Sequence, residues 1–87
     1  MTQDNFDGAM ERLLYRQPFK PFVVVLHDGS RFEIDYPSAT LYRPGIGKSI
    51  FMSPGGVPIY YDHDSVVQII DAPASAAPGR KEQSGTQ

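Results

Sequence analysis

The chain has 87 residues, with ten acidic and eight basic side chains, a net charge of −2 and no cysteine. This length allows one small domain, which buries only about 60% of the surface that its unfolded chain exposes. The absence of cysteine excludes disulfides, thiolate metal sites and thiol redox chemistry, so self-association is the natural way to enlarge the core. Non-specific nucleic-acid binding depends on clustered lysine and arginine, and residues 1–71 carry six basic against nine acidic groups, so nucleic acid is not favoured as a partner.

No segment approaches the roughly 18–20 consecutive apolar residues that a membrane span needs. The first eight residues are polar and acidic, and they lack the apolar run of a signal peptide. We therefore expect a cytoplasmic protein with no membrane partner.

The first predicted element is a helix at residues 5–16. Its apolar residues recur at helical spacing and form one stripe, made of Phe6, Met10, Leu13 and Leu14. Asp4 is the expected N-cap, because a short side-chain oxygen at that position accepts a hydrogen bond from a free N–H of the first turn. Pro18 ends the helix, since a proline biases the residue before it away from helical backbone.

Two strands are expected next, at residues 22–27 and 31–36, joined by Asp28 and Gly29. The first strand is apolar at five consecutive positions, which indicates that both of its faces are covered, and the helix is the expected cover of the second face. The second strand alternates apolar and charged residues, which indicates one buried and one exposed face. An Asp-Gly pair between two such runs is a strong hairpin signal.

The hairpin has two registers open to it. A two-residue turn sets Val25 opposite Phe32, whereas a turn one residue earlier, with Gly29 as a left-handed bulge, sets Val24 opposite Phe32. Only one can hold, because a one-residue slip turns every side chain to the other face. The bulged register is favoured because it collects the larger apolar side chains on one face. Val23 and Val25 would then face the helix or a neighbouring subunit.

Further short strands are expected, at residues 40–43, 49–53, 57–61 and 65–70. Pro58 cannot donate to a ladder, so it marks the start or the open edge of its strand. From residue 72 the chain has no large apolar side chain. The sequence therefore predicts a domain at residues 1–71 and a disordered tail at 72–87.

One helix followed by about five short strands predicts a mainly β fold, arranged as a small SH3-like or Sm-like barrel. The run VVLHDG (residues 24–29) resembles the first Sm motif, in which an apolar strand leads into an Asn-Gly or Asp-Gly turn. The run IYYDHDSV (residues 59–66) is similar to the second motif of bacterial Sm-like proteins. Pro37 departs from the Sm pattern, because it stands where the long bent second strand of that fold would continue.

A second resemblance covers about the first forty residues. The run RQPFKPF (residues 16–22), followed by Leu26, Asp28-Gly29 and Tyr36-Pro37, resembles a set of short uncharacterised bacterial proteins. The resemblance implies a shared domain and no particular activity.

Three patterns that could carry chemistry are outweighed by plainer interpretations. The GKS run at residues 47–49 ends like a phosphate-binding loop, but the glycine required five positions earlier is Tyr42, and a strand is expected to follow. The DHD run at residues 62–64 could hold a metal with His27 and Asp28, but neighbours in an extended segment point to opposite sides. No serine lies in a nucleophile-elbow pattern, and a small barrel leaves little room for an enclosed pocket. We therefore expect no enzyme, and no catalytic, cofactor-binding or metal-binding residue.

The leading hypothesis is a non-catalytic binding or assembly module, which self-associates as a homo-oligomer or docks on a protein partner. Interfaces favour tyrosine because it adds contact area at little cost in entropy. The candidate interaction surface comprises Tyr42, Arg43, Lys48, Tyr60, Tyr61 and His63. A place in the core is the equal alternative for two or three of the tyrosines.

The alternative hypothesis is an Sm-like protein that binds RNA. Arg12, Arg16 and Lys20 would then have to form a basic face together with Arg43 or Lys48. RNA affinity would fall steeply with salt under this hypothesis, because binding to phosphates releases counterions.

Overall fold

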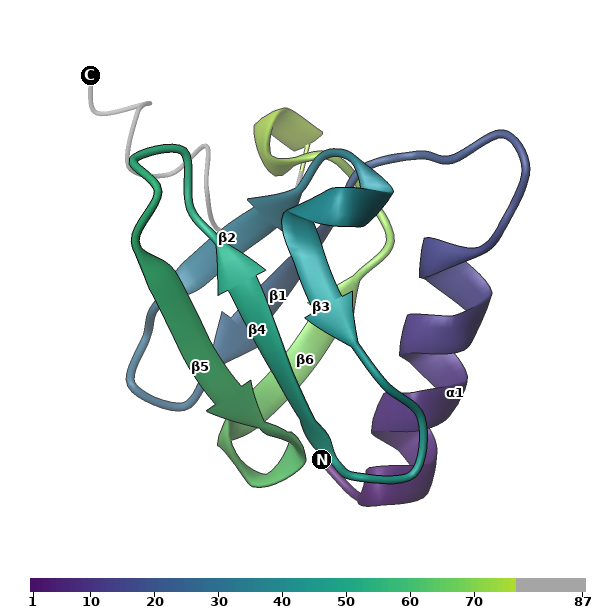
Figure 1. Cartoon of the computed structure of the whole chain (residues 1–87), viewed down its shortest axis with the longest axis vertical. Coiled ribbons are helices and arrows are strands. Elements are labelled where there is room, and N and C mark those ends of the chain that lie inside the picture. The colour runs from purple at the N-terminus through teal and green to yellow at the C-terminus, as the bar shows by residue number, and fades with distance from the viewer. Residues whose placement is uncertain (77–87) are drawn as a thin grey trace.

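One helix and two small antiparallel sheets make up the protein (Figure 1). The computed structural model describes residues 1–76, so the predicted tail from residue 77 onward lies outside the described residues. The helix and strands are α1 (Gln3–Leu14), β1 (Phe22–Leu26), β2 (Arg31–Ile34), β3 (Thr40–Tyr42), β4 (Lys48–Met52), β5 (Pro58–Asp62) and β6 (Val66–Ile70). Three short 3₁₀ turns join or follow them: η1 (Pro37–Ala39), η2 (His63–Ser65) and η3 (Ala74–Ala76). The predicted mainly β fold with one N-terminal helix is confirmed.

The helix begins and ends two residues earlier than predicted. Its N-cap is Thr2 and not Asp4, because the Thr2 hydroxyl accepts a hydrogen bond from the Asn5 N–H at 3.1 Å. Asp4 lies instead in the first turn, where its carboxylate faces the positive end of the helix dipole. The predicted stripe is confirmed, since all four of its members are buried: Phe6, Met10, Leu13 and Leu14. None of the helices within residues 1–76 is both long and apolar enough to cross a membrane.

The strands pair as β2-β1-β6 in one sheet and as β3-β4-β5 in the other. The predicted barrel of about five strands is therefore not closed within the described residues, and the short strand at Thr40–Tyr42 brings the number to six. The division falls between β2 and β3, where Pro37 begins η1. Proline has no N–H for a ladder, so the chain turns out of one sheet and enters the other.

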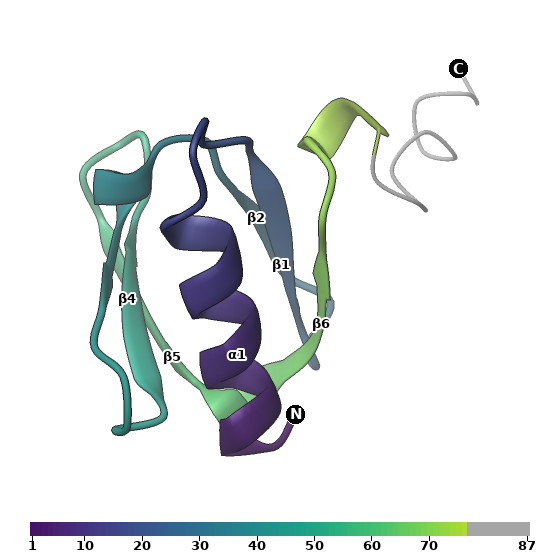
Figure 2. The ribbon, with the colours of Figure 1, turned by 90° about the vertical axis from the view of Figure 1, so that its right-hand side faces the viewer.

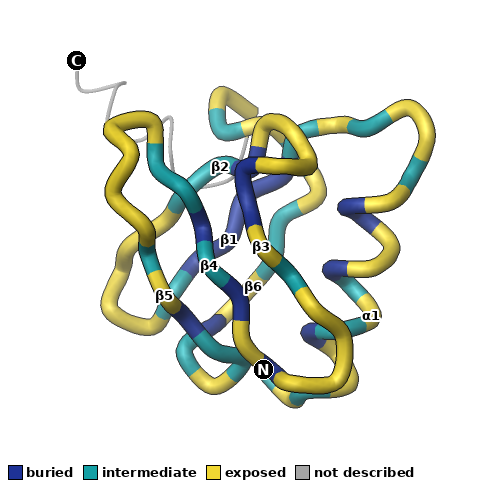
Figure 3. The backbone as a smooth tube through the Cα atoms, viewed as in Figure 1, coloured by how far each residue is buried: buried dark blue, intermediate teal, exposed yellow. Residues whose placement is uncertain are grey.

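The core lies between the two sheets, and α1 closes one side of it. Figure 2 shows α1 in front of the gap, with β4 and β5 on one side and β1 and β6 on the other. Side chains from α1, from β1 and β2 and from β4 and β5 form one buried cluster, which includes Phe6, Leu13, Phe22, Val24, Ile34, Phe51 and Tyr61. Figure 3 shows that the buried parts of α1 face the strands.

The first hairpin has the bulged register. Val24 pairs with Phe32, and Phe22 pairs with Ile34. Gly29 has a φ of 92°, a left-handed conformation that glycine adopts without steric cost, and its N–H donates to the Leu26 carbonyl at 3.0 Å. The register prediction is therefore confirmed.

The expected cover of the second face of β1 is wrong. Phe22 and Val24, not Val23 and Val25, face the side that α1 covers. Val23 and Val25 point to the outer face of β2-β1-β6, where Ile70 and Ala74 pack against them. The reason is that α1 lies over the gap between the two sheets and contacts the inner faces of both. The prediction considered the first hairpin alone and therefore placed α1 on the wrong face of β1. Residues 72–76 are the described part of the predicted tail.

Candidate functional site

Three apolar side chains form a row across the outer face of the β3-β4-β5 sheet. Leu41 pairs directly with Ile50, and Ile50 pairs directly with Tyr60. Side chains alternate between faces along a strand, so this row points away from the core that contains Phe51 and Tyr61. Leu41 is 62% exposed and Tyr60 is 73% exposed. We call Leu41, Ile50 and Tyr60 the outer row.

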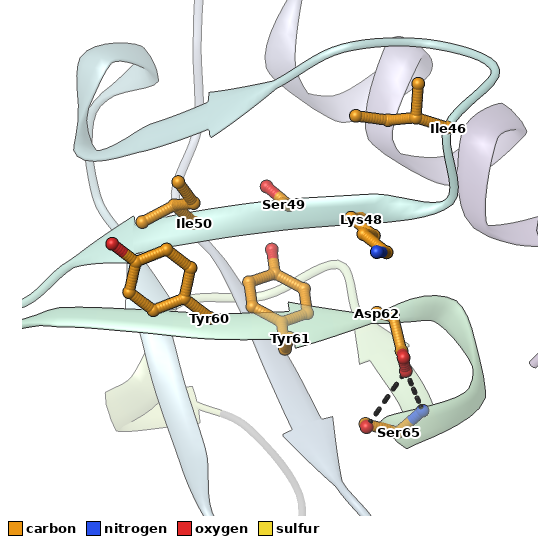
Figure 4. Close-up of a pocket in the computed structure, with 8 residues that line it drawn as sticks. All are labelled: Ile46, Lys48, Ser49, Ile50, Tyr60, Tyr61, Asp62 and Ser65. Atoms are coloured by element: carbon orange, nitrogen blue, oxygen red, sulfur yellow. Dashed lines mark hydrogen bonds between the residues drawn. The ribbon is translucent and has the colours of Figure 1, made fainter.

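A groove of about 490 Å³ adjoins the outer row along β4 and β5 (Figure 4). Ile50 and Tyr60 lie at one end of it, and the Lys48 and Asp62 side chains lie at the other. Ile46, which is 54% exposed, stands over the groove from the loop before β4. The site therefore combines apolar walls with a cation and an anion that occupy paired positions on adjacent strands.

The Asp62 carboxylate is held in place by η2. It accepts hydrogen bonds from the Ser65 hydroxyl and the Ser65 N–H, both at 3.0 Å. These bonds lower the pKa of Asp62, and the nearby Lys48 lowers it further. Asp62 thus caps the turn η2, as short polar side chains commonly do.

Tyr61 follows Tyr60 but points the other way, into the core, and is only 5% exposed. Its hydroxyl points towards Ser49 (Figure 4), and it has no hydrogen-bond partner within the described residues. The Thr40 and Ser49 hydroxyls lie 2.9 Å apart, and each also reaches a strand carbonyl at 3.0 Å. The two hydroxyl protons are thus divided among these three contacts. Burial raises the pKa of Tyr61.

The structure brings three of the six predicted surface residues to the groove: Lys48, Tyr60 and Tyr61. The other three lie elsewhere. Tyr42 packs against the core, and its hydroxyl donates to the Asp7 carboxylate at 2.6 Å. Burial and this bond raise the pKa of Tyr42. The His63 Nδ1 donates to the Met1 carbonyl at 2.8 Å. Arg43 is exposed in the loop after β3.

Two of the basic residues that the RNA-binding hypothesis requires, Arg12 and Arg16, lie beside the Asp71 carboxylate. Two Arg16 nitrogens contact the two Asp71 carboxylate oxygens at 2.8 and 3.2 Å, and Arg16 also donates to the Lys20 carbonyl at 3.1 Å. Arg12 lies 4.0 Å from the same carboxylate. The Arg16 hydrogen bonds lower the pKa of Asp71. This cluster ties the end of β6 to the last turn of α1.

The sequence reasoning missed Leu41, Ile46 and Ile50. A signal for Ile50 existed, because period-two alternation places it on the face opposite Phe51. No such signal existed for Leu41, since nothing in a three-residue strand indicates which face is covered.

No group of three or more metal-ligating side chains occurs in residues 1–76. Comparison of the chain with protein-family models, with curated proteins and with solved structures finds no match.

Proposed function

We propose that the protein is a non-catalytic binding or assembly module, which uses the outer face of the β3-β4-β5 sheet to dock a protein chain. The observation that carries the proposal is the outer row, Leu41–Ile50–Tyr60, on a sheet face that the described residues leave bare. A large aromatic side chain offers about 150–250 Å² of contact area, so Tyr60 alone presents on the order of 100 Å². The largest exposed apolar patch of a soluble monomer is often functional, and patches larger than a few hundred Å² mark interaction sites.

The strand order supports an open, barrel-like arrangement as part of this proposal. The order β6-β1-β2 and then β3-β4-β5 is that of an SH3-like or Sm-like barrel whose long second strand is divided into β2 and β3. The turn η2 between β5 and β6 corresponds to the one-turn connector of such barrels. An open arrangement leaves strand edges free, and free edges favour association with another chain.

The hydroxyls near the groove support a binding role over a catalytic one. Ser49 and Thr40 bond each other and the strand carbonyls, so neither hydroxyl faces a base. The groove itself is open to solvent along β4 and β5 (Figure 4), whereas acid–base chemistry needs groups that converge on one reacting atom.

RNA binding is less well supported. The Arg16 guanidinium is already bonded to Asp71, and Lys48 stands beside Asp62. Phosphate recognition needs cations that are free to neutralise phosphates.

The proposal is tested with a charge on the outer row. Leu41→Asp is compared with Val67→Asp, because Val67 is an exposed apolar residue on the other sheet. Self-association is measured by light scattering, and protein partners by affinity capture with each variant. We expect Leu41→Asp to abolish the capture of protein partners on this face and Val67→Asp to preserve it. Capture of a protein partner that survives Leu41→Asp, or steeply salt-dependent binding of an oligouridine, would contradict the proposal.

A further inference from the structure

The strand β5 has one backbone edge without a partner strand. It pairs with β4 on one side, and within the described part of the chain no strand pairs with its other side. Two hydrogen bonds at the ends of the ladder fix its phase. The His63 N–H donates to the Gly47 carbonyl at 2.8 Å, and the Ser53 N–H donates to the Val57 carbonyl at 3.3 Å.

This phase shows which groups of β5 are free. Hydrogen-bonded and non-hydrogen-bonded pairs alternate along an antiparallel ladder, so Ile59 and Tyr61 direct their backbone groups to β4. Tyr60 and Asp62 direct their N–H and carbonyl groups to the open side. Pro58 offers only a carbonyl there, as expected for a proline at a strand edge.

The other edges of the two sheets are less suited to pairing. The β3 strand has three residues. The β2 strand has four and carries two charged side chains, Arg31 and Glu33, which discourage edge pairing. The β6 strand contains a register shift, and its Val66 carbonyl already accepts a hydrogen bond from the Met1 nitrogen at 2.9 Å. The β5 edge is the regular one.

We propose that two copies of the chain associate by antiparallel pairing of β5 with β5, about a two-fold axis at Tyr60. Tyr60 of each copy would exchange two N–H···O bonds with Tyr60 of the second copy. Each Asp62 N–H would donate to the Pro58 carbonyl of the second copy. The inference rests on the proposed docking role of this sheet, and it names the partner.

The self-pairing fits the side chains as well as the backbone. An antiparallel strand related by a two-fold axis is its own complement, and the Tyr60-centred register sets Asp62 opposite the uncharged Pro58. The outer row then continues across the axis, from Leu41, Ile50 and Tyr60 of one copy to the same three residues of the other. The pairing itself buries the two β5 edges, and the joined rows form one longer apolar surface on the outer face of the extended sheet.

A register centred on Tyr61 would also satisfy the free backbone groups. It would set Tyr60 opposite the Asp62 carboxylate of the second copy and so interrupt the apolar row with a charge. The Tyr60-centred register avoids this and is the one we infer.

Hydrogen exchange of the unmodified chain tests the pairing directly. Within residues 1–76 the Tyr60 and Asp62 amides have no partner strand, whereas the Ile59 and Tyr61 amides bond to β4 and serve as internal controls. Across roughly 10 μM to 1 mM, the range of weak association, exchange at Tyr60 and Asp62 should slow at least about tenfold as dimers form. Exchange at Ile59 and Tyr61 should not follow the same concentration dependence. Light scattering on the same samples should show a monomer–dimer equilibrium.

Two substitutions at Tyr60 separate the contribution of the backbone N–H from that of the side chain. Tyr60→Pro removes the outward N–H and spares the bonds to β4, and Tyr60→Ser removes only the ring. We expect Tyr60→Pro to weaken dimerisation at least about tenfold more than Tyr60→Ser, because each dimer loses two symmetric bonds. If Tyr60→Pro does not fold, the hydrogen-exchange experiment decides alone.

Several results would overturn the inference. These are a monomer at every concentration, a dimer whose Tyr60 amide stays unprotected, and larger assemblies in which β6 amides gain protection together with Tyr60. The docking role can fail separately. If the chain is monomeric but captures a protein in a manner that Leu41→Asp abolishes, the role of the face stands and only the second copy is excluded as its partner.

Discussion

The two sheets differ in what covers their outer faces. On β2-β1-β6, Val23 and Val25 are 1% and 9% exposed, because Ile70 and Ala74 pack on them. The Ala74 N–H also donates to the Glu33 carboxylate at 2.9 Å, which holds η3 against the sheet. The six described residues after β6 are therefore enough to cover Val23 and Val25.

On β3-β4-β5, the described residues provide no such cover. Leu41 and Tyr60 remain mostly exposed, although the face is as apolar at its centre as the covered one. The difference shows that a short segment of this chain can bury an outer apolar row, and among residues 1–76 such a segment covers one of the two sheets. A bare row of this kind is the expected form of a surface that another chain covers.

The core between the two sheets provides the reference for comparing their outer faces. Leu14 is buried in the core cluster that the helix shares with the strands, and Leu14→Ala should cost about 2–4 kcal/mol through lost burial and the cavity left behind. Arg12→Ala should cost under about 0.5 kcal/mol, because this side chain is exposed and its contact with Asp71 is 4.0 Å long. Urea unfolding of both variants measures the difference. Equal costs would mean that α1 does not close the core.

A matched pair of substitutions compares the outer faces themselves. Val23→Ala should cost about 1–3 kcal/mol, because the side chain is fully buried on the covered face. Leu41→Ala removes more atoms but should cost under about 0.5 kcal/mol, because they are in water in the single chain. The measurement is made at a low concentration, so that association adds nothing. A cost for Leu41→Ala that matches that of Val23→Ala would show that the outer row is covered.

Removing the cover should make the two faces alike. A chain of residues 1–71 lacks η3, whereas a chain of residues 1–76 keeps it. We expect the shorter chain to lose about 1–2 kcal/mol, as Val23 and Val25 return in part to water. The longer chain should match the full-length protein within about 0.5 kcal/mol. Thermal unfolding of the three chains tests this, and equal stability of the two shortened chains would contradict the covering role of η3.

The same contrast shows how far the sequence predicts the fold. The α1 stripe and the register of the first hairpin follow from local periodicity and side-chain volume, and both predictions are confirmed. The cover of Val23 and Val25 could not be predicted, because it depends on a contact between β1 and Ala74, about fifty residues later in the chain. The small residues after β6, mainly alanine and proline, resemble a tail in composition, yet alanine packs well in a shallow space over a sheet.

The candidate site was predictable only in part, for a related reason. The sequence marks tyrosines as candidates for contact, and it cannot distinguish Tyr60 from Tyr61 until the pairing of β5 with β4 is known. The register of that pairing determines which of the two tyrosines points to the outer face of the sheet. The break between the two sheets at Pro37 follows from the lack of an N–H, but whether two sheets close into a barrel depends on non-local contacts.

The smallest expected effect concerns two adjacent hydroxyls on opposite faces of β5. Within residues 1–76 the buried Tyr61 hydroxyl makes no well-formed hydrogen bond, although the Ser49 and Thr40 hydroxyls lie close enough to lower its pKa in part. An unsatisfied buried polar group costs about 1–3 kcal/mol, part of which its removal recovers. Tyr61→Phe should therefore be neutral or should stabilise the chain by up to about 1 kcal/mol. Tyr60→Phe should change the stability of the single chain by less than about 0.3 kcal/mol, because the Tyr60 hydroxyl is in water.

The two variants should separate further in alkali. Burial raises the pKa of Tyr61 above its ordinary value of 10.0, so the folded state favours the protonated hydroxyl. The stability of the native chain is then independent of this group below about pH 10 and falls above it, as the unfolded tyrosine ionises first. Tyr61→Phe removes that loss, whereas Tyr60→Phe leaves it in place. Urea unfolding at pH 7 and pH 10.5 should therefore show an advantage of Tyr61→Phe that grows with pH. An advantage that stays constant, or a loss of stability at pH 7, would show that the Tyr61 hydroxyl has a partner in solution and that the inner face of β5 is more polar than its packing indicates.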